Sequence, residues 1–366
     1  MSDSVTKTTA LYRSIHAQPQ MVRTLLDDWE GPTRAALQLG TRERVLLAGI
    51  GTSYHAALVG EYLLRLAGVE AWAVRSYEFT TYPRPLQPSD GVIVISHRGS
   101  KLHGVGAVQR AKLAGTFVVG ITGKHSQMRD TDIMLETVEQ EVSSTHSISY
   151  VGTLVRLAQL AARLAEQRGN AAVARKLEQG LAALPTQMER LLQREGDIHR
   201  VAYDVVAQQR RVIVVGAGPN AATAPEGALK AKEAAYITVE GLELEQAIHG
   251  PFVAFEANDL IIPISIKGPS QPRNADFLRM LHTINTRVLL LGSLPTPESA
   301  PLFAHDRWSR FPLVDTEEVL EELTPLLAVL PLQLFADFLA AARGTDADSF
   351  RTDQELYKRA KEQYQI

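Results

Sequence analysis

The sequence has no cysteine at any of its 366 positions. A disulfide framework, a cysteine-ligated metal and a cysteine nucleophile are therefore excluded. An excess of one charge is also lacking, because 38 lysines and arginines face 41 aspartates and glutamates and the net charge is −3. A chain so close to neutral has no general attraction for nucleic acid, so we expect no nucleic-acid partner.

Membrane and cofactor signals are scarce as well. Met1–Val5 has no basic segment leading into an apolar run, so we expect no secretory signal. The most apolar stretch, Leu326–Ala342, is interrupted by Pro331, Gln333 and Asp337, which predicts a buried helix and no membrane span. No Walker A or zinc-binding motif is present, and the dinucleotide fingerprint lacks its third glycine. We expect a cytoplasmic protein with no metal and no cofactor.

Short apolar runs that lead into helical patterns are present in both halves of the chain. They lie at 44–50, 91–96 and 116–121 in the first half, and at 211–218, 260–265 and 287–292 in the second. The interval 150–208 between the halves has a helical pattern. Continuous apolar strands that alternate with helices indicate parallel sheets covered on both faces. We predict an α/β protein with two doubly wound parallel sheets.

The same pattern divides the chain into four parts. We expect a helical arm over 1–40, a first α/β domain with linker helices over 41–195, a second α/β domain over 196–345, and a C-terminal tail over 346–366.

Three polar segments are candidates for binding an anion. The turn Gly51-Thr52-Ser53 places backbone N–H groups and hydroxyls at the start of a predicted helix, where an anion is stabilised. The loop Ser96–Lys101 follows a predicted central strand, and it offers the hydroxyls of Ser96 and Ser100, the imidazole of His97 and the cations Arg98 and Lys101. The third segment is the hydroxyl run Ser143–Thr145. Helix capping and a solvated surface turn are the alternatives for these residues.

Acid and base groups occur on one predicted helix of the second half. Glu226, Lys230 and Glu233 share a face at i, i+4 and i+7. A carboxylate beside an ammonium in a cleft can move a proton between adjacent carbons and stabilise an enediolate. Ordinary surface ion pairs have the same spacing. His249, before Gly250-Pro251, is a candidate acid or base, with a structural histidine as the alternative.

The chain resembles the sugar isomerase (SIS) domain family, and more narrowly the tandem-SIS isomerase half of glucosamine-6-phosphate synthase. The resemblance covers almost the whole chain. It rests on these segments: His16–Pro19, Gly51–Tyr54, Ser76–Phe79, Val142–Thr145, Glu226–Glu233, His249–Pro251, Pro331–Leu334 and Gly344–Asp348. The resemblance implies two flavodoxin-like three-layer sandwiches and a tail close to the active site.

The resemblance also implies roles for particular residues. Glu233 would move the proton between C1 and C2 of a sugar phosphate, with Lys230 beside it. His249 would assist ring opening from across a homodimer interface, so that two chains share an active site. The residues that would hold the sugar phosphate are Gly51, Thr52, Ser53, Ser96, Arg98, Ser100, Lys101, Ser144 and Thr145.

Several positions depart from the family pattern. The phosphate loop of the family reads Ser-Gln-Ser-Gly-Glu-Thr, whereas here cations stand at Arg98 and Lys101. Glu355 occupies the place of a tail lysine that can form a Schiff base, and Lys358 or Lys361 would have to substitute for it. The sequence also contains no glutaminase domain and no cysteine, so we expect no amination driven by glutamine from this chain alone.

Taken together, these features predict a sugar-phosphate isomerase and deaminase. The most concrete case interconverts glucosamine 6-phosphate with fructose 6-phosphate and ammonia. A fructosamine-6-phosphate deglycase is a second enzymatic hypothesis. A phosphosugar-binding sensor without catalysis is a hypothesis of another class, favoured by the altered loop and the displaced tail lysine.

Overall fold

The computed structural model describes residues 8–313 and 319–364. The first half of the chain forms a parallel five-stranded sheet in the order β2-β1-β3-β4-β5. Its strands are β1 (Val45–Gly49), β2 (Ala71–Arg75), β3 (Gly91–Ile95), β4 (Phe117–Thr122) and β5 (Ile133–Glu136). This is the flavodoxin-like order, in which ligands bind beyond the carboxyl ends of the central strands.

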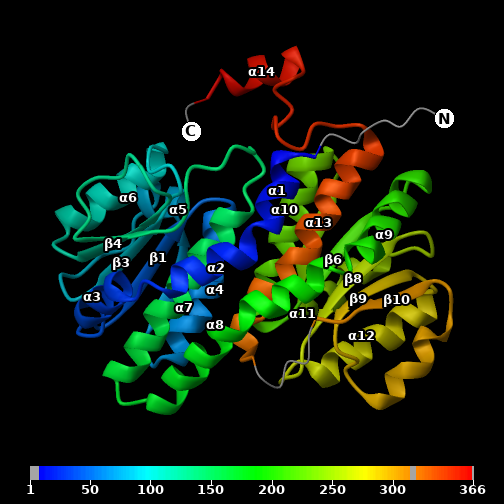
Figure 1. Ribbon diagram of the computed structural model, residues 1–366, viewed down its shortest axis with the longest axis horizontal. Helices are drawn as coiled ribbons and strands as arrows, with labels where there is room; N and C mark the ends of the chain where they lie inside the picture. The colour runs from blue at the N-terminus through cyan, green and yellow to red at the C-terminus, as the bar shows by residue number, and fades with distance from the viewer. Residues whose placement is uncertain (1–7, 314–318, 365–366) are drawn as a thin grey trace.

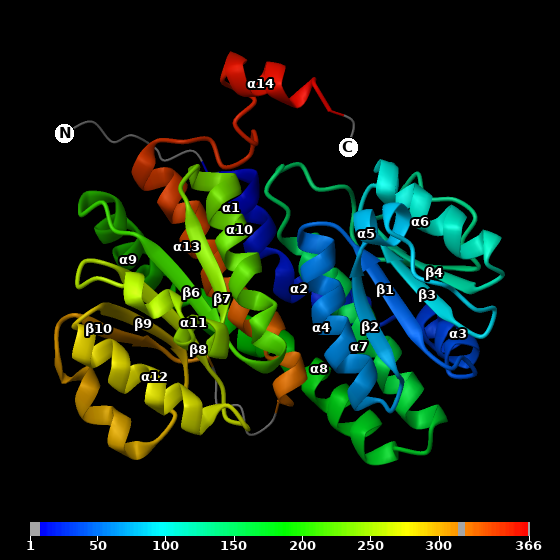
Figure 2. The same cartoon turned by 180° about the vertical axis from the view of Figure 1, so that it is seen from behind.

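The second half repeats that order in a second parallel sheet, β7-β6-β8-β9-β10. The strands are β6 (Val212–Gly216), β7 (Val239–Glu243), β8 (Leu260–Ser265), β9 (Arg287–Gly292) and β10 (Trp308–Phe311). The two sheets lie on opposite sides of the molecule in Figure 1 and Figure 2. The predicted fold class, two doubly wound parallel sheets, is therefore confirmed.

Helices cover the sheets and join the two halves. Those of the first half are α1 (Ala10–His16), α2 (Gln18–Leu26), α3 (Glu30–Leu39), α4 (Thr52–Leu66), α5 (Ser76–Thr81), α6 (Leu102–Leu113) and α7 (Ile148–Gln167). They are followed by α8 (Ala171–Leu192), α9 (Glu195–Ala207), α10 (Thr223–Ala235), α11 (Leu244–Ile248), α12 (Gln271–Ile284), α13 (Pro325–Arg343) and α14 (Glu355–Lys361). Short 3-10 helices are η1 (Gly218–Ala221), η2 (Pro251–Ala254), η3 (Pro297–Ala304) and η5 (Glu321–Leu323).

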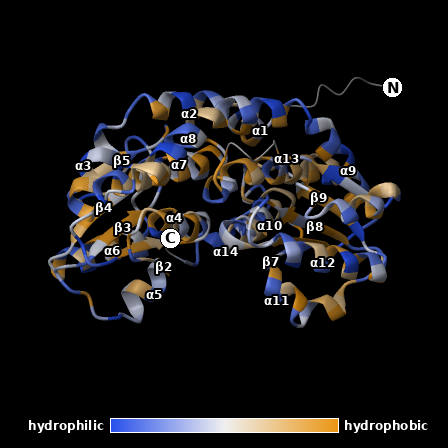
Figure 3. Cartoon of the chain, turned by 90° about the horizontal axis from the view of Figure 1, so that it is seen from below, coloured by the Kyte–Doolittle hydropathy of each residue, from blue (hydrophilic) through white to orange (hydrophobic). Residues whose placement is uncertain are grey.

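The two halves share one apolar core. Helices α7 and α13 are buried along most of their length, and α10 packs closely against α13. The side chains of Leu154 in the first half and Leu334 in the second belong to the same buried cluster. Figure 3 shows the apolar colouring gathered on the strands and the central helices. The continuous core holds the helices α4 and α10, one from each half, in direct contact.

The segment Glu321–Arg343 is long and apolar enough to cross a membrane by length and composition alone, but 83% of its apolar window is buried inside the protein. Burial of this extent is typical of a core helix. It agrees with the buried helix that Pro331, Gln333 and Asp337 predicted for this stretch. The predicted four-part division places β1–β5 within 41–195 and β6–β10 within 196–345. Its boundaries stay predictions.

Both sheets use a glycine to turn from the first strand into the following helix. A Cβ atom on Gly49 would lie 2.3 Å from the carbonyl oxygen of Ser53, and one on Gly216 would lie 2.1 Å from that of Asn220. Because both distances are far below van der Waals contact, only glycine allows the chain to double back so tightly. In the first half, the tight turn brings the start of α4 to the carboxyl edge of the sheet.

Candidate active site

A cavity of about 350 Å³ lies between the two halves. Its volume is at the lower end of the range of about 300–1,000 Å³ that is typical of small-molecule sites. The first half contributes the start of α4, the loop after β3 and the start of α7, and the second half contributes α10. The C-terminal segment completes the wall with Phe350 and Lys361.

Most of the predicted binding residues lie around this cavity. Gly51, Thr52 and Ser53 line it from the turn before α4, and Ser96, Arg98, Ser100, Lys101 and Ser144 line it from two neighbouring loops. Lys230 and Glu233 line it from α10. Segments far apart in the sequence are thus brought to one place by the two strand-to-helix turns and the contact between α4 and α10.

The Lys230–Glu233 pair is buried, so the alternative of a surface ion pair is wrong. Lys230 is 1% exposed, and its Nζ lies 2.5 Å from Oε2 of Glu233 and 3.0 Å from Oγ1 of Thr52. Burial raises the pKa of the Glu233 carboxyl although the Lys230 ammonium opposes the shift. Burial alone would lower the pKa of Lys230, but the carboxylates of Glu233 and Glu226 outweigh it and raise that pKa. The pair is suited to hold and release a proton while the ammonium stays charged.

Glu226 lies behind this pair and does not line the cavity. Its carboxylate accepts hydrogen bonds from Thr52 (3.2 Å) and from Nδ1 of His55 (2.6 Å), and Nζ of Lys230 is 3.5 Å away. Burial opposes ionisation, but Lys230 and His55 outweigh it and lower the pKa of Glu226. Glu226 is therefore a buried counter-charge that holds the lysine of α10 against the turn of α4.

The loop after β3 adds two cations, Arg98 and Lys101, to the cavity wall. Within the described part of the chain, no acidic side chain forms an ion pair with Arg98 or Lys101. Partial burial and the neighbouring Arg98 lower the pKa of Lys101. Ser96, by contrast, is 6% exposed, and its Oγ accepts the backbone N–H of Gly99 at 3.3 Å. Two cations without an acidic partner beside a helix start suit an anionic group.

Three predicted site residues do not line the cavity. Thr145 is fully buried and donates its hydroxyl to the carbonyl of Ala347, which fastens the start of the tail. The side chain of His249 is 68% exposed, and its Nε2 lies 2.9 Å from Glu245. Lys358 is exposed on α14, whereas Lys361, the other tail lysine considered, does line the cavity.

Comparison with known proteins identifies the family. The SIS domain family model matches residues 38–165. The first half of the chain therefore contains a SIS domain. The chain is 32% identical over 355 residues to glutamine–fructose-6-phosphate aminotransferase (isomerizing) of Gloeobacter violaceus. That match covers 93% of this chain but only 57% of the relative, so the chain spans little more than half of the relative's length.

Solved structures share the fold of nearly the whole chain. The C-terminal domain of glucosamine-fructose-6-phosphate aminotransferase from Francisella tularensis superposes with a TM-score of 0.83 at 19% identity, covering 93% of this chain and 98% of that one. Glucosamine-6-phosphate deaminase from Thermotoga maritima gives a TM-score of 0.69 at 17% identity, with 93% and 97% covered. Both halves of the chain therefore have the same fold as these solved structures.

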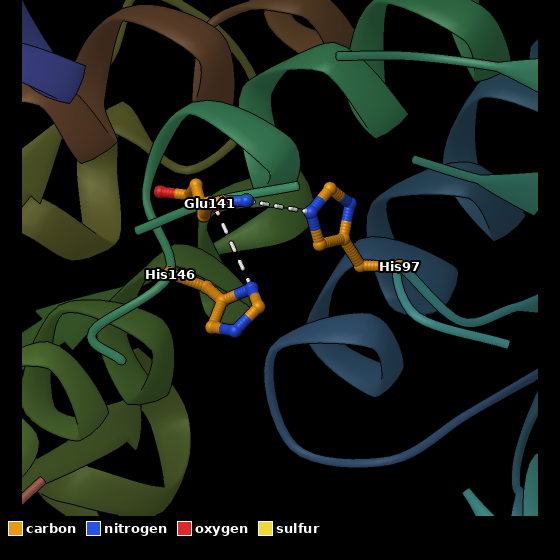
Figure 4. Close-up of side chains that lie close together, drawn as sticks. All are labelled: His97, Glu141 and His146. Carbon is orange, nitrogen blue, oxygen red and sulfur yellow. Dashed lines mark hydrogen bonds and ion pairs between the residues drawn. The ribbon is translucent and has the colours of Figure 1, made fainter. Parts of the chain in front are cut away.

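The SIS protein also has a cluster of two histidines and a glutamate beside the cavity (Figure 4). The ligand atoms of His97, Glu141 and His146 all lie within 4.8 Å of one another. The Glu141 carboxylate, however, accepts the backbone N–H groups of residues 147–149 at 2.8–3.2 Å, so it caps the start of α7. His97 Nε2 accepts the backbone N–H of Glu141 at 3.2 Å. These contacts account for the cluster without an ion, and we assign no metal to it.

The two histidines are held in the neutral state. Burial, with His146 nearby, lowers the pKa of His97 to about 4. Burial and the Lys230 ammonium lower the pKa of His146 to about 3. At neutral pH both rings therefore offer hydrogen bonds to the cavity without adding charge.

Sequence reasoning missed several residues that line the SIS cavity. His146 follows the hydroxyl run directly, so it could have been included on position alone. Tyr150 and Thr153 of α7 carried no such signal, because they fall within an otherwise apolar helical pattern.

Proposed function

We propose that the protein interconverts an amino-hexose 6-phosphate and a ketose phosphate by moving a proton between C1 and C2. In the concrete case, glucosamine 6-phosphate and water give fructose 6-phosphate and ammonia, or the reverse. The observation that carries this proposal is the buried Lys230–Glu233 pair, which lines a cavity that the cations Arg98 and Lys101 also line. The name of the Thermotoga maritima neighbour, a glucosamine-6-phosphate deaminase, is consistent with it.

In this reaction Glu233 takes the proton from one of the two reacting carbons and returns it to the other. Its raised pKa lies closer to neutrality than that of an ordinary glutamate, which favours both the uptake and the release of a proton. Lys230 stays charged and polarises the C1 oxygen, which becomes negative in the enolate of the amino sugar. Arg98 and Lys101 hold the phosphate at the opposite end of the sugar.

We further propose that the active site is shared in a homodimer. His249 is exposed at the end of α11, and Val253 in the following η2 segment is 78% exposed. Since His249 does not line the cavity of its own chain, it can assist ring opening only in the cavity of a partner. We also propose a cytoplasmic location.

Purified protein is incubated with glucosamine 6-phosphate, with fructose 6-phosphate plus ammonia, and with a fructosamine 6-phosphate. We expect turnover of the first two, and a loss of about 10²- to 10⁴-fold in Glu233→Gln. The matched control Glu240→Gln, on an exposed residue of β7, leaves the rate unchanged. Amine release from the third substrate alone would indicate the deglycase. Tight binding without turnover of any substrate would indicate the sensor and overturn the proposal.

A further inference from the structure

Two buried side-chain atoms at the cavity have no hydrogen-bond partner in the described part of the chain. They are Nδ1 of His97 and Oη of Tyr150. Tyr150 is 1% exposed and stands in the first turn of α7, in the wall between Ser149 and Thr153. A buried hydroxyl without a partner is destabilising, because it has lost its water and gained nothing in return. Such a group in a cavity wall points to a ligand that completes its hydrogen bonding.

The neighbouring hydroxyls of α7 are already occupied. Thr153 donates to the carbonyl of Ser149 at 2.9 Å, and the Ser149 hydroxyl donates to Glu141. Tyr150 is therefore the residue of this wall with a hydrogen-bonding group to spare. Burial, with the Glu226 carboxylate adding to it, raises the pKa of the Tyr150 phenol well above its ordinary value. The phenol stays protonated, so it can both donate a hydrogen bond and accept one.

The packing of α7 locates Tyr150 along the cavity. Helix α7 packs against α4, and a Cβ atom on Gly60 of α4 would lie 3.1 Å from the side chain of Leu157 of α7. Both helices begin at the cavity, so the first turn of α7 with Tyr150 lies beside the first turn of α4 with Thr52. Nζ of Lys230 donates a hydrogen bond to Oγ1 of Thr52 at 3.0 Å. The group that Tyr150 meets on a sugar phosphate is therefore close to the reacting carbons.

We propose that Tyr150 is a specificity-determining residue that binds the C3 hydroxyl of the sugar, next to the two carbons that exchange the proton. The inference rests on the proposed function and restricts its substrate class to sugar phosphates with a free hydroxyl at C3. A site built to hydrogen-bond a substrate hydroxyl discriminates strongly against an analogue that lacks it, because the protein group is then left unpaired.

Tyr150→Phe tests the proposal because it removes the hydroxyl and keeps the ring. The kcat/KM is measured for glucosamine 6-phosphate and for its 3-deoxy analogue. We expect the variant to lose at least about tenfold on the parent sugar and less than about twofold on the analogue. An equal loss on both sugars, or no loss on the parent, overturns the proposal.

Thermal unfolding separates this role from a structural one. Tyr12→Phe is the matched control, since the Tyr12 hydroxyl is bonded to Glu195 at 2.9 Å and does not line the cavity. We expect Tyr12→Phe to lower the Tm without changing the preference between the two sugars. Tyr150→Phe keeps or raises the Tm, because it removes an unpaired buried group. A lowered Tm for Tyr150→Phe shows that its hydroxyl is already bonded inside the protein and overturns the inference.

A binding measurement keeps this inference distinct from the proposed function. If the wild-type protein turns over no sugar phosphate, the proposed function fails, and the same comparison is made with dissociation constants. The probes are glucitol 6-phosphate and 3-deoxyglucitol 6-phosphate, which have no carbonyl group and cannot react. A preference for the first that disappears in Tyr150→Phe supports the role of Tyr150. No preference, or no binding of either probe, overturns it.

Discussion

Nδ1 of His55 lies 2.6 Å from Oε2 of Glu226, and this pair joins helix α4 of the first half to helix α10 of the second. Because the pKa of Glu226 is lowered, its carboxylate is charged and accepts a hydrogen bond from Nδ1–H of the imidazole. The same carboxylate lies 3.5 Å from Nζ of Lys230. The first half of the protein thereby positions the helix that carries the proposed acid and base.

Replacing Glu226 tests this link. In Glu226→Gln the Lys230 ammonium loses one of its two carboxylates, and we expect a decrease of about 3–5 kcal/mol in the free energy of unfolding. Urea denaturation at neutral pH measures it. The exposed Glu240→Gln serves as control and changes the stability by less than about 0.5 kcal/mol. A Glu226→Gln variant as stable as the wild type would show that the buried pair carries no net stabilisation.

The pH dependence of the same variant gives a second check. A carboxyl with a lowered pKa in the folded state stabilises the protein above its ordinary pKa, and this contribution is lost as the pH falls through the folded value. The stability difference between wild type and Glu226→Gln should therefore be largest at neutral pH and shrink in acid. A constant difference from neutral pH to strong acid contradicts the ionised state of Glu226.

The neutral histidines predict a separate loss of stability in acid. His97 and His146 have folded pKa values of about 4 and 3, below the ordinary value of 6.5. Between pH 6.5 and these values the unfolded chain binds more protons than the folded one, so stability falls with falling pH, by up to about 1.4 kcal/mol per histidine per pH unit. In His146→Asn the slope of unfolding free energy against pH should be clearly smaller. His125→Asn, on a side chain that is 82% exposed, should keep the wild-type slope.

The fold shows where sequence patterns predict strands and where they do not. The runs at 91–96 and 260–265 became the central strands β3 and β8, which are buried at every position. The four strands that the pattern did not predict, β2, β5, β7 and β10, are the edges of the two sheets. Each edge strand has partly exposed positions, so its sequence is not a continuous apolar run.

The candidate site was predictable to the extent that its residues lie in turns after strands. Ser53 and Arg98 could be proposed from such positions, because the carboxyl ends of parallel strands meet at one edge. The burial of Lys230 could not be predicted. Its spacing of three and four residues from neighbouring glutamates is the same on an exposed helix as on a helix packed between two halves. Whether Tyr150 lines the cavity depends on how α7 is rotated about its axis. Packing between segments that are distant in the sequence determines that rotation.

The cationic loop predicts how tightly the anion is held. Arg98→Gln and Lys101→Gln should each weaken the binding of glucosamine 6-phosphate by about 10- to 100-fold, because each removes a charged hydrogen-bond donor. Isothermal titration measures the dissociation constants. Lys112→Gln is the matched control, since Lys112 lies on helix α6, which follows the cationic loop, but is paired with Asp132 outside the cavity. Equal affinities for all three variants and the wild type would show that Arg98 and Lys101 do not bind the phosphate.

The two lysines of the tail provide the last comparison. Lys361 lines the cavity, with its Nζ 5.4 Å from the centre of the Phe350 ring, whereas Lys358 on the same helix does not line it. Lys361→Ala should weaken glucosamine 6-phosphate binding by about two- to fivefold, because a solvent-accessible cation contributes at most about 1 kcal/mol. Lys358→Ala should have no effect. A larger effect of Lys358→Ala than of Lys361→Ala would mean that α14 presents a different face to the cavity when the sugar phosphate is bound.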